Sequence, residues 1–255
     1  MKTTMDRFLE IKQNLNQVYE RIGAAAMRAG RKSDEVKLVV VSKGQPLEVI
    51  QAAIAAGAKI FGENYPEEAI EKIQAVDSAD ITWHMIGHLQ SRKAKLVCDH
   101  FDWMQSLDSL HLAEKMERLL AERNQPLPVL LEFNVGGEET KSGWLAGEAS
   151  NWPQLLPEIR QILEFPHLQV HGLMTMPPLT ANRDEARIHF KKMVELQKYL
   201  RKQFPQSNWA ELSMGTSSDY EAAVEEGATF VRIGTSILGP RPDRPLSQLT
   251  KLRQV

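Results

Sequence analysis

The chain has 255 residues, 42% of them hydrophobic, which is enough to bury the core of one large domain or two small ones. Its formal net charge of -2 gives no general electrostatic reason to expect a nucleic acid or an acidic membrane as a partner. Residues 1–15 lack a secretory signal, no apolar run reaches membrane-spanning length, and the single cysteine excludes an internal disulfide, so we expect a cytoplasmic protein.

The predicted elements begin with a helix. Apolar residues at alternating three- and four-residue steps, among them Phe8, Ile11 and Leu15, form the stripe of an amphipathic helix that ends near Gly30. We therefore assign residues 1–30 to an N-terminal helix that precedes the first strand.

From residue 37 onwards, short apolar runs alternate with helical patterns. The run Leu38–Val41 is uninterrupted, which is typical of a strand buried on both faces in a parallel sheet. Strands are predicted over residues 38–41, 59–61, 81–86, 101–105, 129–135, 167–173, 209–212 and 229–233, with helices over 47–56, from 66, over 90–98, around 112–119, and over 148–163, 183–204 and 219–226. Strands that alternate with helices imply a parallel sheet.

The number of these units decides between the two common parallel folds. Eight strand-helix units in this length fit a (β/α)₈ TIM barrel, whereas an open doubly wound sheet would usually carry a glycine fingerprint that this chain lacks. We find no linker or internal repeat and predict a single domain over residues 1–255. The tail at residues 241–255 is given no role.

Lys43 follows the first buried strand and is the first candidate site residue. A lysine stem in apolar surroundings has a lowered pKa because desolvation disfavours the charged amine, and a neutral amine can attack a carbonyl to form a Schiff base. The alternative is a solvated lysine where a strand meets its loop.

Two loops rich in glycine and hydroxyl groups follow the last two strands, at residues 213–219 and 232–236. In barrels of this kind such loops often hold phosphate, because backbone N–H groups and hydroxyls donate to its oxygens. The alternative is that the polar residues only cap the following helix. Arg232 would lie at a ring nitrogen of a ligand or form an ion pair at the barrel mouth.

A ligand with an aldehyde at one end and a phosphate at the other would span Lys43 and these loops, and pyridoxal 5'-phosphate is the commonest such cofactor. Other residues are weaker candidates. Met174 and Met176 either pack in the barrel or line the ligand site. Asn64 with Glu63 either lies near the cofactor or caps a helix. His84 and His88 are four residues apart at a strand end, and we predict no metal site.

Several segments resemble the pyridoxal phosphate homeostasis protein family, in order over about residues 8–240. The resemblance is carried by VVVSK at 39–43, FGENY at 61–65, WHMIGHLQSRKAK at 83–95, NVGGEETKSG at 134–143, HGLMTM at 171–176, LSMGTSSDYEAAVEEGAT at 212–229 and VRIGTSILG at 231–239. Two positions depart from the family pattern, since Gly44 stands where many relatives have threonine and Arg92 where many have asparagine.

The resemblance implies the barrel of bacterial alanine racemase, with pyridoxal phosphate bound through Lys43. It implies that phosphate lies near Ser213, Gly215, Gly234 and Thr235, with Arg232 at the ring nitrogen and Asn64 beside the ring. It also implies a cytoplasmic protein without established catalytic activity that buffers the cofactor or delivers it to apo-enzymes, and so maintains vitamin B6 and the balance of amino and keto acids.

The rival hypothesis is a racemase-like enzyme that uses the same Schiff base. Racemisation needs a second acid or base on the opposite face of the cofactor, which alanine racemase takes from a tyrosine of a separate carboxyl-terminal domain. The tyrosines here are Tyr19, Tyr65, Tyr199 and Tyr220, most of them in predicted helices. We therefore expect a non-catalytic carrier or regulator, and a monomer because the dimerising domain is missing. A third possibility is an interaction protein that has no need for Lys43.

Overall fold

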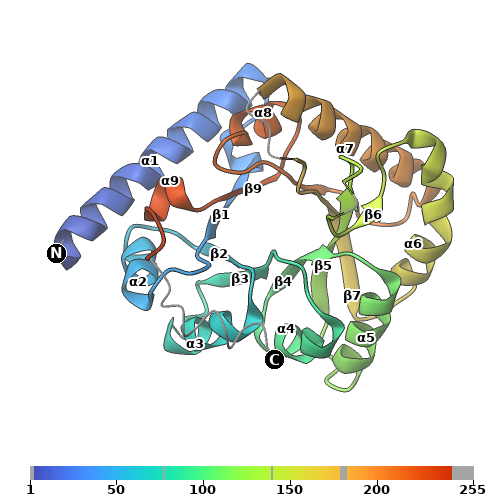
Figure 1. The fold of residues 1–255 in the computed structure, drawn as a ribbon, viewed down its shortest axis with the longest axis horizontal. Coiled ribbons are helices and arrows are strands. Elements are labelled where there is room, and N and C mark those ends of the chain that lie inside the picture. The colour runs from blue at the N-terminus through green and yellow to red at the C-terminus, as the bar shows by residue number, and fades with distance from the viewer. Residues whose placement is uncertain (1–2, 77, 139, 179–182, 243–255) are drawn as a thin grey trace.

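The computed structural model describes residues 3–76, 78–138, 140–178 and 183–242. In this part of the chain, eight parallel strands form a closed barrel with helices outside it (Figure 1). The strands run in the order β4-β3-β2-β1-β9-β8-β7-β5, and pairing between β4 and β5 closes the ring. Their bounds are β1 Lys37–Val41, β2 Ile60–Glu63, β3 Thr82–Met85, β4 Trp103–Leu107, β5 Leu127–Asn134, β7 Leu168–Met174, β8 Glu211–Ser213 and β9 Phe230–Ile233.

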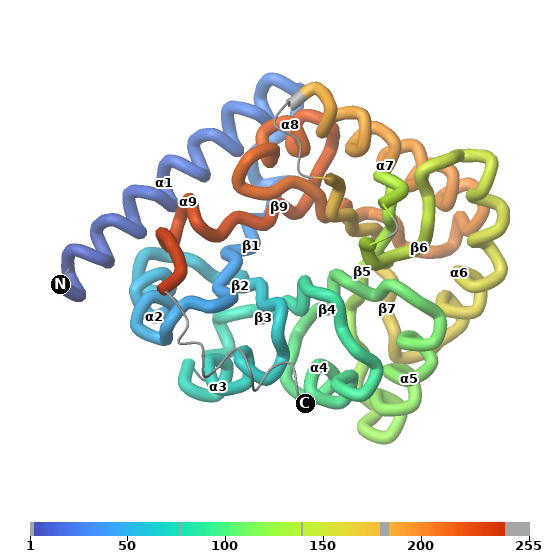
Figure 2. The backbone as a smooth tube through the Cα atoms, viewed as in Figure 1, coloured from blue at the N-terminus to red at the C-terminus, as the bar shows by residue number. Residues whose placement is uncertain are grey.

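The helices lie around the barrel, as the backbone tube also shows (Figure 2). Their bounds are α1 Thr4–Arg28, α2 Leu47–Ala55, α3 Pro66–Val76, α4 Ala94–His100, α5 Leu110–Ala121, α6 Leu156–Leu163, α7 Arg183–Gln203, α8 Tyr220–Glu225 and α9 Thr235–Leu238, with 3₁₀ turns at Ser33–Glu35, Ser91–Lys93 and Ala149–Leu155. The apolar strands are therefore covered on both faces, which explains their uninterrupted hydrophobic runs.

The N-terminal helix α1 covers the side of the barrel where the surrounding helices are shortest. It begins with a capping box between Thr3 and Asp6 and buries its apolar stripe against α2, α8 and α9. Polar contacts add to this packing: Arg28 pairs with Glu225, and the amide of Asn14 donates to the carbonyl of Ile237 at 3.1 Å. Since α8 and α9 have only six and four residues, α1 supplies much of the cover on this side of the barrel.

The predicted barrel and N-terminal helix are confirmed, and the differences are local. An additional two-residue strand, β6 (Trp144–Leu145), pairs with the end of β5 and is too short to give a hydrophobic pattern. The helix expected from residue 90 begins as a 3₁₀ turn at Ser91 and becomes α4 at Ala94. Most of the tail, residues 243–255, lies outside the described residues.

A substitution pair in α1 tests the role of this helix. Leu15→Ala should lower the free energy of unfolding by about 2–5 kcal/mol, because Leu15 is 1% exposed and its removal leaves a cavity under α1. Leu9→Ala in the same helix is the control, since Leu9 is 55% exposed and should change stability by only about 0.5 kcal/mol. Urea denaturation measures both values, and equal losses would show that α1 does not contribute to the core.

Candidate functional site

A cavity of about 150 Å³ lies at the carboxyl ends of β1 and β9, and it contains most of the predicted site residues. Lys43, Asn64, Arg232, Gly234 and Thr235 all line it. The remaining lining residues are Val41, Ile86, Met176, Thr216, Ser217 and Arg241. Met174, Ser213 and Gly215 do not line the cavity.

Lys43 lies in a tight turn that follows β1. The N–H of Gln45 donates to the carbonyl of Ser42 at 3.0 Å, and Gly44 has a φ of +70°, as the third position of a type II turn requires. The side-chain amide of Gln45 donates to the carbonyl of Gly239 at 3.1 Å. The turn is therefore bonded both within itself and to the segment after α9.

The amine of Lys43 is partly buried, and its surroundings lower its pKa. Desolvation is the main cause, the positive charge of Arg241 lowers the pKa further, and the negative charge of Glu63 opposes both effects. A larger fraction of neutral amine follows, which is the form that attacks a carbonyl carbon.

Arg232 extends from β9 into the barrel and is only 3% exposed. Its guanidinium donates to the hydroxyl of Ser213, to the carbonyl of Thr175 at 2.8 Å and to the sulfur of Met176 at 2.9 Å. Burial lowers its pKa to about 10, while Glu132 and Asp219 oppose that shift, so the guanidinium stays charged at neutral pH.

Ser213 lies behind Arg232 in a chain of buried hydrogen bonds. Its hydroxyl donates to the side-chain carbonyl of Gln105 at 2.6 Å, and the amide nitrogen of Gln105 lies 2.7 Å from Nδ1 of His84. Burial lowers the pKa of His84 to about 3, so its imidazole is neutral. The structure thus places Ser213 where it orients Arg232, and not on the cavity wall expected for a phosphate ligand.

Gly215 shapes the loop after β8 without lining the cavity. It has a φ of +91°, and a Cβ there would come within 2.5 Å of the Cβ of Ala223. Its carbonyl accepts from the N–H of Arg232 at 3.1 Å. This conformation brings the next two residues, Thr216 and Ser217, to the cavity.

Asp219 precedes α8, but its carboxylate makes no capping hydrogen bond to that helix. It accepts from the N–H of Thr216 at 2.5 Å and from the hydroxyl of Thr216 at 3.2 Å. The capping alternative for this residue is therefore wrong, and the donors of Thr216 are already used. The hydroxyls of Ser217 and Thr235 are on exposed residues that line the cavity.

Asn64 supplies a polar atom that has no partner within the described part of the chain. Its side-chain oxygen is buried and accepts no hydrogen bond, although the residue lines the cavity. Neighbouring Glu63 is fully buried and bonds to Ser42 and Lys72. An unpaired buried acceptor is costly, so the position of Asn64 indicates a ligand that would donate to it.

The other sequence candidates lie away from the cavity. Met174 is fully buried in a core cluster with Val39 and Phe230, which is the barrel-packing alternative, whereas Met176 lines the cavity. His84 is buried against Trp103, and exposed His88 bonds to Asp108 at 2.7 Å. In residues 3–76, 78–138, 140–178 and 183–242, no group of three or more potential metal ligands occurs.

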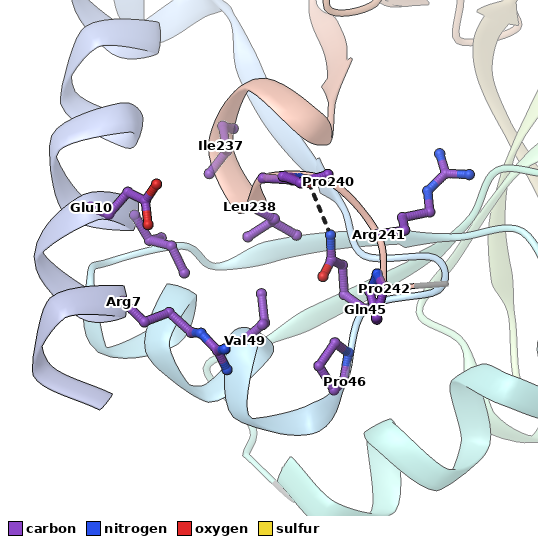
Figure 3. A pocket seen from close by; sticks show the side chains of 12 residues that line it. Arg7, Glu10, Gln45, Pro46, Val49, Ile237, Leu238, Pro240, Arg241 and Pro242 are labelled. Atoms are coloured by element: carbon purple, nitrogen blue, oxygen red, sulfur yellow. Dashed lines mark hydrogen bonds between the residues drawn. The ribbon is translucent and has the colours of Figure 1, made fainter. Parts of the chain in front are cut away.

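A second cavity of about 320 Å³ lies on the other side of the Lys43 turn, between α1, α2 and α9 (Figure 3). It is larger, but it contains neither Lys43 nor the loop after β8. Arg241 lies between the two cavities, and its guanidinium extends away from Arg7 and Glu10. The larger of these two cavities is therefore the one that lacks Lys43.

Sequence reasoning missed several residues of the site. Thr216 and Ser217 were included only as part of a loop, Met176 was left open between barrel packing and the ligand wall, and Arg241 was not predicted to line the cavity. Lys72 was missed as well, although its spacing of four from Glu68 on α3 indicates an ion pair. The sequence did not reveal that this pair is buried beneath the Lys43 turn.

Comparisons with known proteins identify the fold and the family of this chain. The model of the family described as alanine racemase, N-terminal domain, matches residues 10–242, and this match defines the class of barrel. An alanine racemase of Clostridium difficile has a TM-score of 0.67 at 17% identity and covers 92% of this chain but 60% of the racemase, which shows the fold alone.

More similar proteins define the family within this class. The pyridoxal phosphate homeostasis protein of Haemophilus influenzae is 40% identical over 91% of this chain and 97% of its own length. The structure of PipY from Synechococcus elongatus with pyridoxal phosphate bound has a TM-score of 0.74 at 37% identity, covering 87% of this chain and all of PipY (100%). The chain belongs to the pyridoxal phosphate homeostasis protein family.

The charge of Arg241 should be measurable at Lys43. Arg241→Gln should raise the pKa of the Lys43 amine, because a positive charge that disfavours the protonated lysine is removed. Desolvation remains, so the pKa should stay below that of an ordinary lysine. The pH dependence of Lys43 acetylation, followed by mass spectrometry, measures this change, with Arg7→Gln as the control. An unchanged or lower pKa in Arg241→Gln would contradict the electrostatic account.

Proposed function

We propose that this protein binds pyridoxal 5'-phosphate as a Schiff base on Lys43, and that it buffers the cofactor or delivers it to apo-enzymes. The observation that carries the proposal is the cavity, where an amine of lowered pKa lies with two loops of glycine and hydroxyl residues. The names of the relatives and the pyridoxal phosphate in the PipY structure support it. The biological role would be the maintenance of vitamin B6 and of amino- and keto-acid balance.

The residues present fit this cofactor. When bound, it supplies an aldehyde that a lysine amine attacks and a ring that can accept electrons. Lys43 would hold the aldehyde end, while Ser217, Gly234 and Thr235 would donate to the phosphate. Asn64, with its unpaired oxygen, would accept a hydrogen bond from the ring substituents.

Arg232 would lie at the ring nitrogen, and Ser213 would hold it there. Because the guanidinium is a donor with no acceptor, it would keep the ring nitrogen unprotonated. An unprotonated ring withdraws electrons less strongly, which disfavours carbanion chemistry. Ser213 and Gly215 thus contribute to the site through Arg232. The hydroxyl of Ser213 accepts from its guanidinium, and the carbonyl of Gly215 accepts from its backbone N–H.

Three further features favour a carrier over a racemase-like enzyme. The cavity, at about 150 Å³, is smaller than the roughly 300–1,000 Å³ of sites that enclose a drug-sized ligand, so a bound cofactor would be partly exposed and able to exchange. No tyrosine is among the described residues that line the cavity. The relatives are named as homeostasis proteins and not as enzymes.

We also propose that the protein acts in the cytoplasm as a monomer, and that its partners are the cofactor and the apo-enzymes that receive it. Within the described ranges, no helix is both long enough and apolar enough to span a membrane.

The covalent attachment is tested by absorbance. Protein mixed with pyridoxal phosphate should show the absorbance of a protonated Schiff base, and Lys43→Ala should abolish it, because the attacking amine is gone. Lys59→Ala is the control, since Lys59 is exposed and outside the cavity. Unchanged absorbance in Lys43→Ala would remove the assignment.

The carrier assignment is tested by proton exchange. Loaded protein is incubated with L-alanine in deuterated water, and loss of the α-proton signal is followed by NMR. We expect no faster exchange than with free pyridoxal phosphate at the same concentration, because the cavity lacks a tyrosine acid or base and Arg232 disfavours carbanion formation. Rapid exchange that disappears in Lys43→Ala would instead establish a racemase-like enzyme.

A further inference from the structure

A buried lysine, Lys72, lies beneath the Lys43 turn and has all of its hydrogen-bond donors in use. Lys72, on α3, is 7% exposed. Its ammonium donates to Glu63 at 2.7 Å, to Glu68 at 2.6 Å and to the carbonyl of Ser42 at 3.0 Å. An ammonium group has three N–H donors, so these three acceptors satisfy it completely.

The hydrogen bonds of Lys72 and its acceptors include both residues that flank Lys43. Ser42, which precedes Lys43, is bonded to Lys72 through its carbonyl, and its hydroxyl donates to Glu63 at 2.7 Å. Gly44, which follows Lys43, donates its N–H to the same oxygen of Glu68 that Lys72 contacts, at 2.6 Å. The residues that flank Lys43 are therefore joined through one buried ammonium.

We propose that Lys72, Glu63 and Glu68 are positioning residues that hold the turn from Ser42 to Gln45 so that the amine of Lys43 faces the cavity. This inference rests on the proposed function of Lys43. In this arrangement Lys72 is kept as a paired cation and does not itself attack the cofactor, although both lysines lie at the same end of the barrel.

The turn that carries Lys43 contains a glycine and therefore needs support from its surroundings. Gly44 is the residue with the greatest backbone freedom, and the turn containing it has to keep one conformation for the amine to meet an aldehyde repeatedly. Hydrogen bonds to ionised groups are stronger than neutral ones, and burial within the barrel rim protects them from water. The glycine-containing turn is not rigid by itself. The buried hydrogen bonds to charged groups therefore hold it in one conformation.

Glu68 offers the sharpest test, because its side chain is 22% exposed and its removal leaves Lys72 paired with Glu63. Glu68→Ala removes the acceptor of the Gly44 N–H, whereas Glu68→Gln keeps a carbonyl oxygen in the same place. Glu71→Ala is the matched control, since it removes a carboxylate from an exposed position on the same helix.

The first readout uses the protein without cofactor. Hydrogen exchange of the Gly44 amide should accelerate by about tenfold or more in Glu68→Ala, as the loss of a hydrogen bond to a charged group implies. It should stay close to the wild-type rate in Glu68→Gln and Glu71→Ala. If Glu68→Ala does not fold, hydrogen exchange of the wild-type protein tests the proposal instead. A Gly44 amide that is unprotected in the wild-type protein would overturn it.

The second readout is the rate of Schiff-base formation with pyridoxal phosphate at a temperature well below unfolding. Glu68→Ala should be slower by about tenfold, with Glu68→Gln restoring most of the rate. A wild-type rate in Glu68→Ala, or a lower melting temperature as its only change, would overturn the positioning role. If the wild-type protein forms no Schiff base, the proposed function fails instead, and the exchange of the Gly44 amide still tests the support of the turn.

Discussion

The structure depends on the pairing of β1 with β9, which joins the first and last strands of the barrel. Lys37 pairs with Phe230 and Val40 with Ile233, so the carboxyl ends of these strands lie next to each other. This register places the Lys43 turn beside Gly234 and Thr235. Gly234 is so close to Val41 that a Cβ would lie 3.0 Å from the Val41 carbonyl. The candidate site is therefore a consequence of barrel closure.

Three basic side chains at this end of the barrel, Lys72, Lys43 and Arg232, have different surroundings and therefore different properties. Lys72 is surrounded by acceptors and is a structural ammonium. Lys43 has a cavity beside it, and desolvation together with the positive charge of Arg241 lowers the pKa of its amine. Arg232 is almost completely buried yet stays charged, because Ser213, Thr175 and Met176 accept hydrogen bonds from it and carboxylates lie near it. The surroundings of a basic side chain thus decide its chemical properties.

Much of the fold could be predicted because the strands are nearly continuous apolar runs separated by helical patterns. The position of Lys43 followed from the end of the first run, and the two polar loops followed from the ends of the last two. Side-chain direction could not be predicted in the same way. Whether Ser213 faces a ligand or Arg232 depends on how β8 is placed against β9, and the burial of Lys72 depends on how α3 packs beneath the turn.

The most direct measurement is to locate the lysine that holds the cofactor. Protein loaded with pyridoxal phosphate is reduced with borohydride, digested, and analysed by mass spectrometry for the modified peptide. Our account predicts a single modification on Lys43, with Lys72 unmodified because all its donors are bonded. Modification of Lys72, or an unmodified chain that has nevertheless retained the cofactor before reduction, would contradict it.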